Sequence, residues 1–426
     1  MLRARSGFVA ARYCAPMSHR LPIGSGVEGL CRRRTRDAGE RTGLLMPLSE
    51  DRLRIGILFS ETGLTAVVER TQRMAAMMAV DEINARGGVL GRPLEPFLRD
   101  PRSDPRRARQ EAAALLDEGV ETIFGCYMSS TRKSVLPLLE KREALLFYPT
   151  LYEGFEYSQA CVYSGAAPNQ NSIWLADHLL RTYGDRFVFI GSNYVFPYES
   201  NRIMRDYLSS RGAKVLEERY VPMAFDSADI ARAVEDLRRR APAIVFSTTV
   251  GDATVALYRA YARAGFDRAR MPIASLTTGE PELAAMGAEA AEGHITAAPY
   301  FSVLKSQENQ RFVRAFRARY GEDAAISAAT EAAYFQVHLF AAAVERAGSA
   351  DRRSVLAALP GVSFDAPQGA VRVDARTHHT WLWPRVARVG ADGAFEVLAA
   401  AEHPVRPDPY LVDPAPQAWG AVAAGG

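Results

Sequence analysis

The sequence lacks the motifs that mark most enzymes, and it lacks long apolar runs. No segment approaches roughly 18 consecutive apolar residues, the length that predicts a membrane span. GxSxG, HExxH and Walker A motifs are absent, and no GxGxxG opens a helix. Asp252 after Gly251 is explained more simply as a helix N-cap than as a base. No nucleophile–base–orienter set is visible, so we expect a protein that is not an enzyme and uses no cofactor.

Histidine and cysteine are scarce as well. The seven histidines are scattered, and the one adjacent pair, His378–His379, indicates a solvated turn or an interface more than a metal site. Of the four cysteines, Cys126 and Cys161 sit in or beside apolar segments and are interpreted as reduced core residues. No disulfide is demanded, which fits the cytoplasm without proving it.

Positive charge is concentrated at the N-terminus. Residues 1–50 carry nine arginines and four acidic residues, so the rest of the chain is net −2 although the total is +3. The folded body therefore gives no indication of direct nucleic-acid binding. The longest apolar run of the leader, Phe8 to Ala11, is too short for a signal peptide. We expect residues 1–50 to be a disordered leader, with translation starting at Met46, and residues 413–426 to be a tail.

What the chain does contain is a regular alternation of strand and helix patterns in two series. Such an order predicts an α/β fold with doubly wound parallel sheets. No long linker separates the series, so we expect two lobes joined by short hinge crossovers. The expected strands are 54–60, 93–99, 123–125, 145–148, 186–191, 214–220, 243–247, 273–275, 371–373, 381–389 and 395–398. The expected helices are 67–85, 104–118, 169–183, 228–240, 309–320, 328–347 and 352–358. Three more helices are expected to end at 141, 211 and 264, after N-cap residues 129–131, a loop over 192–198 and an N-cap at 252.

Polar and aromatic residues follow several of these strands at the point where each strand ends. In an open α/β sheet, ligands bind beyond the carboxyl ends of the strands, where helix N-termini offer free N–H groups. Three clusters recur at equivalent places: Cys126–Ser129, Tyr148–Tyr152 and Ser192–Tyr198. Hydroxyls beside flat apolar faces suit a small polar ligand.

The clusters also indicate that this ligand is uncharged. A cleft for an amino-acid zwitterion should offer a carboxylate for the ammonium, and none of the three clusters has one before Glu153 or Glu199. We expect the ligand carbonyl to accept hydrogen bonds around Ser129 and its NH2 group to donate near Thr150 and Tyr194. Ser129 also has the position of a helix N-cap.

Several long segments together resemble a known family: RIGILFSETG, GCYMSSTRKSVLP, YPTLYEGFEYS, GAAPNQNS, VFIGSNYVFPYES, VFSTTVGDAT, IASLTTGE and DAPQGAVRV. They are similar to amide-binding regulators of the AmiC type and, less closely, to urea and short-chain amide substrate-binding proteins of ABC transporters. Both groups belong to the type I periplasmic-binding-protein superfamily, in the Leu/Ile/Val-binding branch. The resemblance runs from about Arg54 to Tyr410.

The resemblance implies the lobe boundaries and the site. The N-terminal lobe would comprise residues 51–164 and 300–373, and the C-terminal lobe residues 165–299 and 374–412. The aromatic side chains at positions 148, 152 and 196 would limit the alkyl chain of the ligand. Carried over motif by motif, the ligand-binding residues would be Tyr127, Ser129, Tyr148, Pro149, Thr150, Tyr152, Tyr194, Phe196 and Val250, with Thr277, Thr278 and Glu280 as weaker candidates.

The resemblance also implies a function. The main hypothesis is a cytoplasmic sensor that holds an AmiR-like antiterminator protein and releases it on binding a short-chain amide, so that an amidase operon is expressed. The alternative is a periplasmic substrate-binding protein of a urea or amide ABC transporter. Phe196, where amide regulators carry Tyr, and the His378–Thr380 turn match the urea-binding branch, whereas STTVGDAT and LTTGEPEL match the regulators. Monomer and homodimer both remain open.

Overall fold

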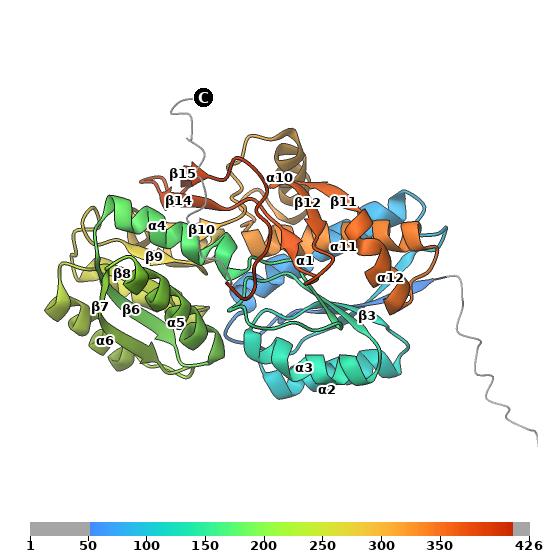
Figure 1. The fold of residues 1–426 in the computed structure, drawn as a ribbon, viewed down its shortest axis with the longest axis horizontal. Coiled ribbons are helices and arrows are strands. Elements are labelled where there is room, and N and C mark those ends of the chain that lie inside the picture. The colour runs from blue at the N-terminus through green and yellow to red at the C-terminus, as the bar shows by residue number, and fades with distance from the viewer. Residues whose placement is uncertain (1–51, 412–426) are drawn as a thin grey trace, which may run out of the picture. The chain divides into compact units, whose positions relative to one another are not determined.

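The computed structural model describes residues 52–411 (Figure 1). Our predictions of a leader at residues 1–50 and a tail at 413–426 therefore lie outside the described residues. None of the helices in the described range is long and apolar enough to cross a membrane. The predicted α/β fold is confirmed, with two main sheets that each lie between two layers of helices.

The first sheet has five strands, all parallel, in the order β2-β1-β3-β4-β5. Its central strands are fully buried, as expected for parallel strands covered on both faces. The strands are β1 (Leu53–Leu58), β2 (Leu94–Arg99), β3 (Thr122–Gly125), β4 (Leu145–Tyr148) and β5 (Cys161–Tyr163).

Helices from distant parts of the chain cover this sheet. Figure 1 shows α2 and α3 on one side and α1 and α11 on the other. The ring of Phe340 in α11 lies 5.4 Å from that of Phe124 and 5.7 Å from that of Phe147, so α11 packs directly on β3 and β4. The helices of this lobe are α1 (Ala66–Ala85), α2 (Pro105–Asp117), α3 (Ser129–Lys141), α10 (Gln307–Tyr320), α11 (Ala328–Ala347) and α12 (Arg352–Ala358).

The second sheet has seven strands in the order β15-β14-β10-β9-β8-β6-β7. Five are parallel, and β14 and β15 add an antiparallel edge. The strands are β6 (Arg186–Ser192), β7 (Lys214–Val221), β8 (Ile244–Thr248), β9 (Ile273–Ser275), β10 (Ile295–Ala298), β14 (Arg385–Val389) and β15 (Phe395–Ala400).

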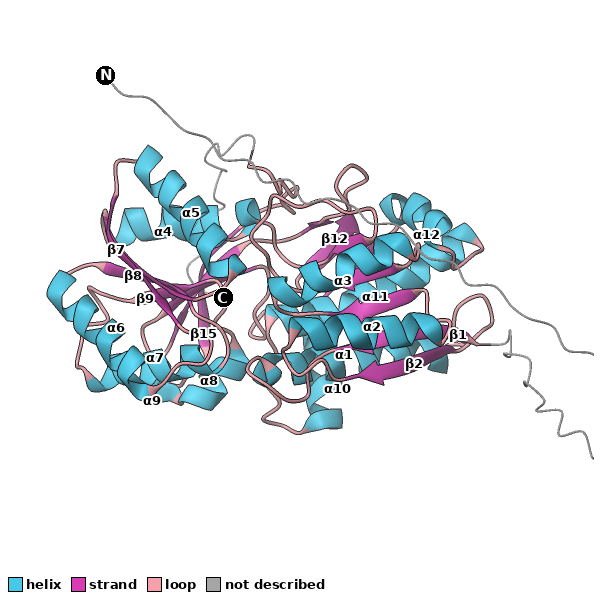
Figure 2. Cartoon of the chain, turned by 90° about the horizontal axis from the view of Figure 1, so that it is seen from below, coloured by secondary structure: helices cyan, strands magenta, loops and turns pink. Residues whose placement is uncertain are grey.

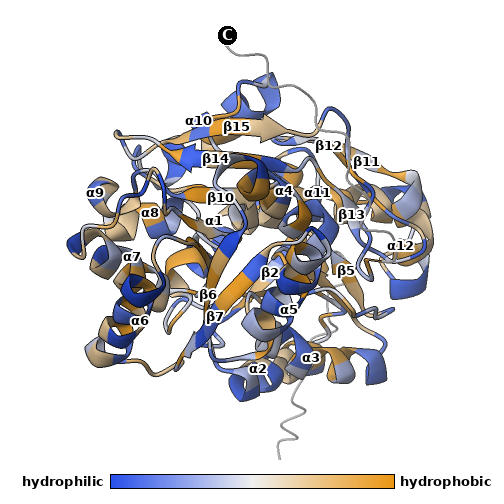
Figure 3. Cartoon of the chain, turned by 60° about the vertical axis from the view of Figure 1, so that its left-hand side comes forward, coloured by the Kyte–Doolittle hydropathy of each residue, from blue (hydrophilic) through white to orange (hydrophobic). Residues whose placement is uncertain are grey.

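The second sheet is also covered on both faces (Figure 2). One hydrophobic cluster joins it to α4 and α5, and another joins it to α6–α9. In Figure 3 strand β6 is largely hydrophobic, whereas α6 carries both hydrophobic and hydrophilic residues, as a surface helix should. The helices are α4 (Ser172–Thr182), α5 (Val195–Ser210), α6 (Ser227–Arg240), α7 (Asp252–Arg263), α8 (Glu280–Met286) and α9 (Ala288–Ala291).

The chain passes between the two sheets three times. The first passage follows β5 and contains a short 3-10 helix (Pro168–Gln170), and the second links β10 to α10. The third links a small sheet, made of β11 (Ser363–Ala366), β12 (Gly369–Val373) and β13 (Thr380–Trp381), to β14. Gln170 Nε2 donates to the carbonyls of Thr380 and Val405, so the first and third passages are bonded to each other.

Most predicted elements are present, and the differences concern short strands. The expected strand over 381–389 is divided, because β13 pairs with β12 while β14 pairs with β10. The third passage therefore falls after Trp381, later than the predicted boundary at residue 374. Strands β5, β10 and β11, of three or four residues each, and helices α8 and α9 were not among the expected elements. Segments this short carry too little periodicity to be recognised.

Candidate functional site

A small cavity lies where five loops converge, at the carboxyl ends of β3, β4, β6, β8 and β9. About 210 Å³ of space lies between its walls, part of it open to solvent. Its lining residues come from both lobes: Tyr127, Ser129, Thr150 and Leu151 from the first, and Tyr194, Phe196, Val250 and Thr277 from the second. Six of the nine ligand-binding residues expected from the sequence are in this set, and Leu151 and Thr277 join them.

The other three predicted residues, Tyr148, Pro149 and Tyr152, do not line this cavity. Tyr148 is fully buried and its hydroxyl donates to the carbonyl of Tyr127 at 2.6 Å. The Tyr152 ring stacks on Tyr163, with ring centroids 5.0 Å apart. Both tyrosines pack in the core between the first sheet and α2 and α3, so they support the loops that form the cavity instead of limiting the alkyl chain.

Ser129 is the first residue of α3, and the N-cap is Met128. This corrects the interpretation of Ser129 as a capping residue. Met128 provides no side-chain cap, so the first N–H groups of α3 remain available at the cavity. The Ser129 hydroxyl instead donates to Glu153 Oε2 at 2.5 Å and accepts from Arg132 Nη1 at 3.2 Å.

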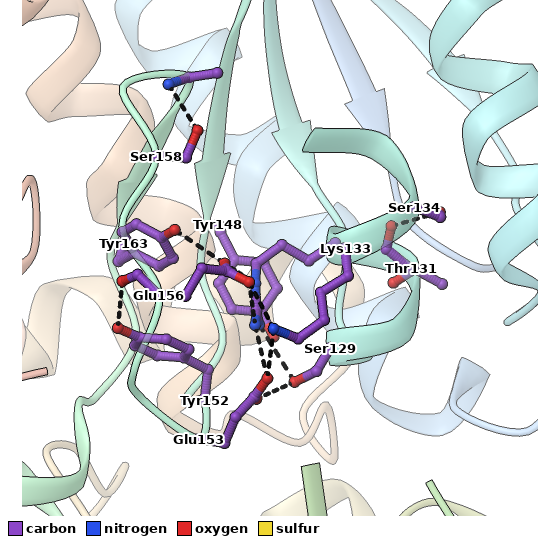
Figure 4. Close-up of polar contacts among 12 residues, drawn as sticks. Ser129, Thr131, Lys133, Ser134, Tyr148, Tyr152, Glu153, Glu156, Ser158 and Tyr163 are labelled. Atoms are coloured by element: carbon purple, nitrogen blue, oxygen red, sulfur yellow. Dashed lines mark hydrogen bonds and ion pairs between the residues drawn. The ribbon is translucent and has the colours of Figure 1, made fainter. Parts of the chain in front are cut away.

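A buried ion-pair network lies directly behind Ser129 (Figure 4). Arg132 has no exposed surface and donates to Glu153 Oε1 at 3.0 Å and to Glu156 Oε1 at 2.7 Å. Lys133 Nζ lies 3.4 Å from Glu153 Oε1 and 2.8 Å from Glu156 Oε2. Burial alone would raise the pKa of Glu156, but Arg132 and Lys133 lower it to about 2. The network therefore fixes the 149–160 loop to the first turn of α3.

The carboxylate of Glu153 is consequently not available to a ligand ammonium, because it is already paired with two cations and a hydroxyl. The guanidinium of Arg132 also stacks over the rings of Tyr148 and Tyr152, at 4.7 and 4.9 Å from their centroids. Sequence patterns did not identify Arg132 as part of the site. A charged residue in a helical pattern predicts a solvated face of the helix. Only the two glutamates in the next loop could have indicated that Arg132 is buried and paired.

Of the remaining polar groups of the cavity, Thr277 Oγ1 already donates to the carbonyl of Thr249 at 2.9 Å, whereas three other hydroxyls keep hydrogen-bonding capacity. The hydroxyls of Tyr127 and Tyr194 form no hydrogen bond within residues 52–411, and burial raises the pKa of both well above the usual range, so they are neutral. Thr150 Oγ1 accepts from Gln72 Nε2 at 3.2 Å, which leaves its own proton free. The cavity thus offers neutral donors and acceptors to a polar guest.

A second cavity adjoins the first and shares Tyr127, Leu151 and Thr277 with it; about 470 Å³ of space lies between its walls, part of it open to solvent. Most of its lining is apolar, but Glu282 projects into it. Glu282 Oε2 accepts from the N–H of Gly279 at 2.9 Å, while Oε1 is buried without a partner. Burial raises the pKa of Glu282 to about 7, so the carboxyl is neutral over most of the acidic range.

The two lobes touch beside these cavities. Val68, Tyr127 and Met128 of the first lobe form a hydrophobic cluster with Tyr194 of the second. At Gly251, which has φ 57°, an added Cβ would lie 2.1 Å from the carbonyl oxygen of Leu64. Glycine is required here because the backbones of the two lobes approach so closely.

Two other sequence interpretations are corrected by the structure. His379 is fully buried, stacks on Tyr163 with ring centroids 4.1 Å apart and bonds to the Tyr152 hydroxyl, so the His378–His379 pair is not a solvated turn. Burial lowers the pKa of His379 to about 3. Asp252 is the first residue of α7, whose N-cap is Gly251.

Cys126 and Cys161 are buried free thiols, as predicted. Within residues 52–411 no cluster of His, Cys, Asp or Glu could hold a metal ion.

Several known proteins are similar to this chain in sequence. A Leu-, Ile-, Val-, Thr- and Ala-binding protein of Pseudomonas aeruginosa is 22% identical over 338 residues, which are 77% of this chain and 87% of that protein. A limonene hydroxylase of Geobacillus stearothermophilus is 29% identical over 128 residues, but the match spans only 23% of that protein and 30% of this chain.

Solved structures agree with the fold. The solute-binding protein of an R. palustris ABC transporter, in complex with benzoate, has a TM-score of 0.75 at 19% identity and covers 84% of this chain and 98% of its own. The branched-chain amino acid transporter substrate-binding protein LivJ of Streptococcus pneumoniae, in complex with isoleucine, has a TM-score of 0.72 at 19% identity, covering 82% and 98%. A family model described as "Periplasmic binding protein domain" matches residues 53–415. The chain is therefore a solute-binding protein of the type I periplasmic-binding-protein family, the family of the Leu/Ile/Val-binding proteins.

Proposed function

We propose that this protein is the substrate-binding receptor of an ABC transporter for a short-chain amide or urea. The observation that carries the proposal is the small cavity between the lobes, lined by neutral hydroxyls and apolar faces and containing no uncommitted carboxylate. A small ligand with one polar group and a short alkyl chain matches such a lining. The transporter role is supported by the structural similarity, since solved structures similar to this chain include substrate-binding proteins of ABC transporters.

The chemistry of the cavity favours an uncharged ligand over an amino acid. An amino-acid ammonium needs a carboxylate, and Glu153 is already paired with Arg132 and Lys133. Glu282 belongs to the adjoining cavity and does not line the small one. Each neutral hydrogen bond contributes about 1 kcal/mol, so a ligand this small should bind with micromolar rather than nanomolar affinity.

The protein acts on its ligand by closure and not by chemistry. Tyr127 and Thr150 of one lobe and Tyr194 of the other line the same space, so a ligand contacts both sets when the lobes are together. Ligand therefore favours the closed state by its differential affinity for it, and a membrane permease that distinguishes the two states reads out occupancy. Ser129 bonds to a carboxylate and a guanidinium, and no histidine or lysine contacts its hydroxyl.

Isothermal titration calorimetry tests the ligand class. Acetamide, propionamide, butyramide and urea are titrated into the purified protein, with leucine and benzoate as controls because relatives bind such ligands. We expect at least one amide, or urea, to bind with micromolar affinity. We expect neither leucine nor benzoate to bind. Tight binding of leucine or benzoate, with no response to amides, would overturn the assignment.

The cytoplasmic regulator is the second candidate, and one observation favours it. The segments STTVGDAT and LTTGEPEL, which supply Val250 and Thr277 to the cavity, are similar to those of amide-binding regulators. Cell fractionation separates the two proposals: a periplasmic protein is a receptor, whereas a cytoplasmic protein that co-purifies with an antiterminator and releases it on adding amide is a regulator. A gene for a permease or for an amidase beside this one gives an independent answer.

A further inference from the structure

The buried network behind Ser129 determines which hydrogen-bonding role that serine can play toward a ligand. Ser129 Oγ is hydrogen-bonded to Glu153 Oε2 (Figure 4) and also to Arg132 Nη1. A guanidinium can only donate and a carboxylate can only accept. The single proton of the Ser129 hydroxyl is therefore given to Glu153, and one of its two lone pairs is used by Arg132.

What Ser129 Oγ can still offer to the cavity is its second lone pair. It accepts a hydrogen bond and cannot donate one. This reverses the role expected from the sequence, in which the Ser129 hydroxyl donates to a ligand carbonyl. The arrangement is held firmly, because Arg132 and Glu153 are both buried and Arg132 is also bonded to Glu156.

Thr150 provides the complementary group. Its Oγ1 accepts from Gln72 Nε2, and its own proton has no acceptor within the described part of the chain. Ser129 and Thr150 line the same cavity. A hydrogen-bond acceptor and a free hydroxyl donor therefore face one small space, and a primary amide carries the matching pair of groups, an NH2 and a carbonyl.

We propose that the buried Arg132–Glu153 pair makes Ser129 an obligate acceptor and thereby selects ligands that present an N–H2 group over isosteric ketones. The inference rests on the proposed function and deepens it. The ligand lies with its NH2 group toward Ser129 and its carbonyl toward Thr150. A ketone places a methyl group where the NH2 would be, and leaves the Ser129 lone pair unsatisfied. Arg132 and Glu153 are thus positioning residues, since they act through Ser129.

Calorimetry with propionamide and 2-butanone, which have the same size and shape, tests the proposal. We expect the wild-type protein to bind propionamide at least about tenfold more tightly than 2-butanone. Glu153→Gln supplies an amide NH2 that can donate to Ser129 and frees the serine proton, so the preference should shrink by about fivefold or more. Glu156→Gln is the matched control, because Glu156 also binds Arg132 but does not touch Ser129; its preference should equal that of the wild type.

A second variant keeps the test decisive if Glu153→Gln fails to fold. Ser129→Ala removes the acceptor, so propionamide affinity should fall while 2-butanone affinity stays the same. The proposal is overturned if the wild type binds both ligands equally, or if Ser129→Ala leaves the preference intact. If propionamide binds without preference, only this inference fails. If neither propionamide nor any other amide or urea binds, the proposed function fails and the inference falls with it.

Discussion

Replacing Glu282 by Gln should change the pH dependence of stability in a direction that the structure dictates. Burial raises the pKa of Glu282 from an ordinary value of 4.5 to about 7. Between these values the folded protein holds a proton that the unfolded chain releases, so the free energy of unfolding falls as the pH rises from about 4.5 to about 7. Over that range the loss is on the order of 3 kcal/mol.

Gln cannot ionise, and it keeps an oxygen that accepts from the N–H of Gly279. Glu282→Gln should therefore match the wild type near pH 4.5 and exceed it in stability by about 2–3 kcal/mol near pH 8. Glu69 and Glu331 also have pKa values raised by burial, to about 7 and about 8, but both proteins contain them and their effects cancel in the difference.

The assay is urea unfolding of both proteins at about pH 5 and about pH 8, with the difference in unfolding free energy compared between the two conditions. Glu402→Gln, at an exposed position, is the matched control and should show no difference at either pH. A difference that is the same at both pH values would refute the reasoning, and so would a variant less stable than the wild type near pH 8.

Three further predictions follow from single contacts. Arg132→Met should lower the unfolding free energy by about 3–5 kcal/mol in urea denaturation, because it leaves Glu153 buried without its main partner. Adding Glu153→Gln should recover part of this loss. An Arg132→Met variant as stable as the wild type would contradict the reasoning. Tyr194→Phe should weaken amide binding about fivefold in calorimetry without changing the melting temperature, since that hydroxyl has no partner in the described structure, and a lower melting temperature would indicate a structural role. Gly251→Ala should weaken ligand binding about tenfold or more, because the added Cβ meets the Leu64 carbonyl and opposes closure; unchanged affinity would show that the lobes need not approach this closely.

The order of helices and strands was predictable because each long element carries its own periodic pattern. Helix α11 (Ala328–Ala347) is apolar over most of its length and the FVFIG segment is a continuous buried run, so both are recognised locally. Which strands pair is not a local property. The separation of β13 from β14, three residues apart, depends on partners at β12 and β10 that the segment itself does not reveal.

The candidate site was predictable to the extent that strand ends converge. Ser129, Thr150 and Tyr194 come together because they follow parallel strands. The sequence could not separate Tyr148 from its neighbours, because consecutive strand residues point to opposite faces and the pattern does not say which face meets the cavity. Arg132 was missed for a different reason: its burial depends on Glu153 and Glu156 in another loop, a tertiary effect that overrides the helical pattern.

The packing of α11 against α1 and the first sheet has a consequence for biosynthesis. The rings of Phe124 and Phe147 lie against Phe340, a residue that leaves the ribosome about two hundred positions after them. The first lobe cannot complete its interior until the strands of the second sheet from β6 to β10 have been synthesised. The nascent chain thus exposes one face of the first sheet until α11 has been synthesised, and such exposed apolar surface favours aggregation during translation.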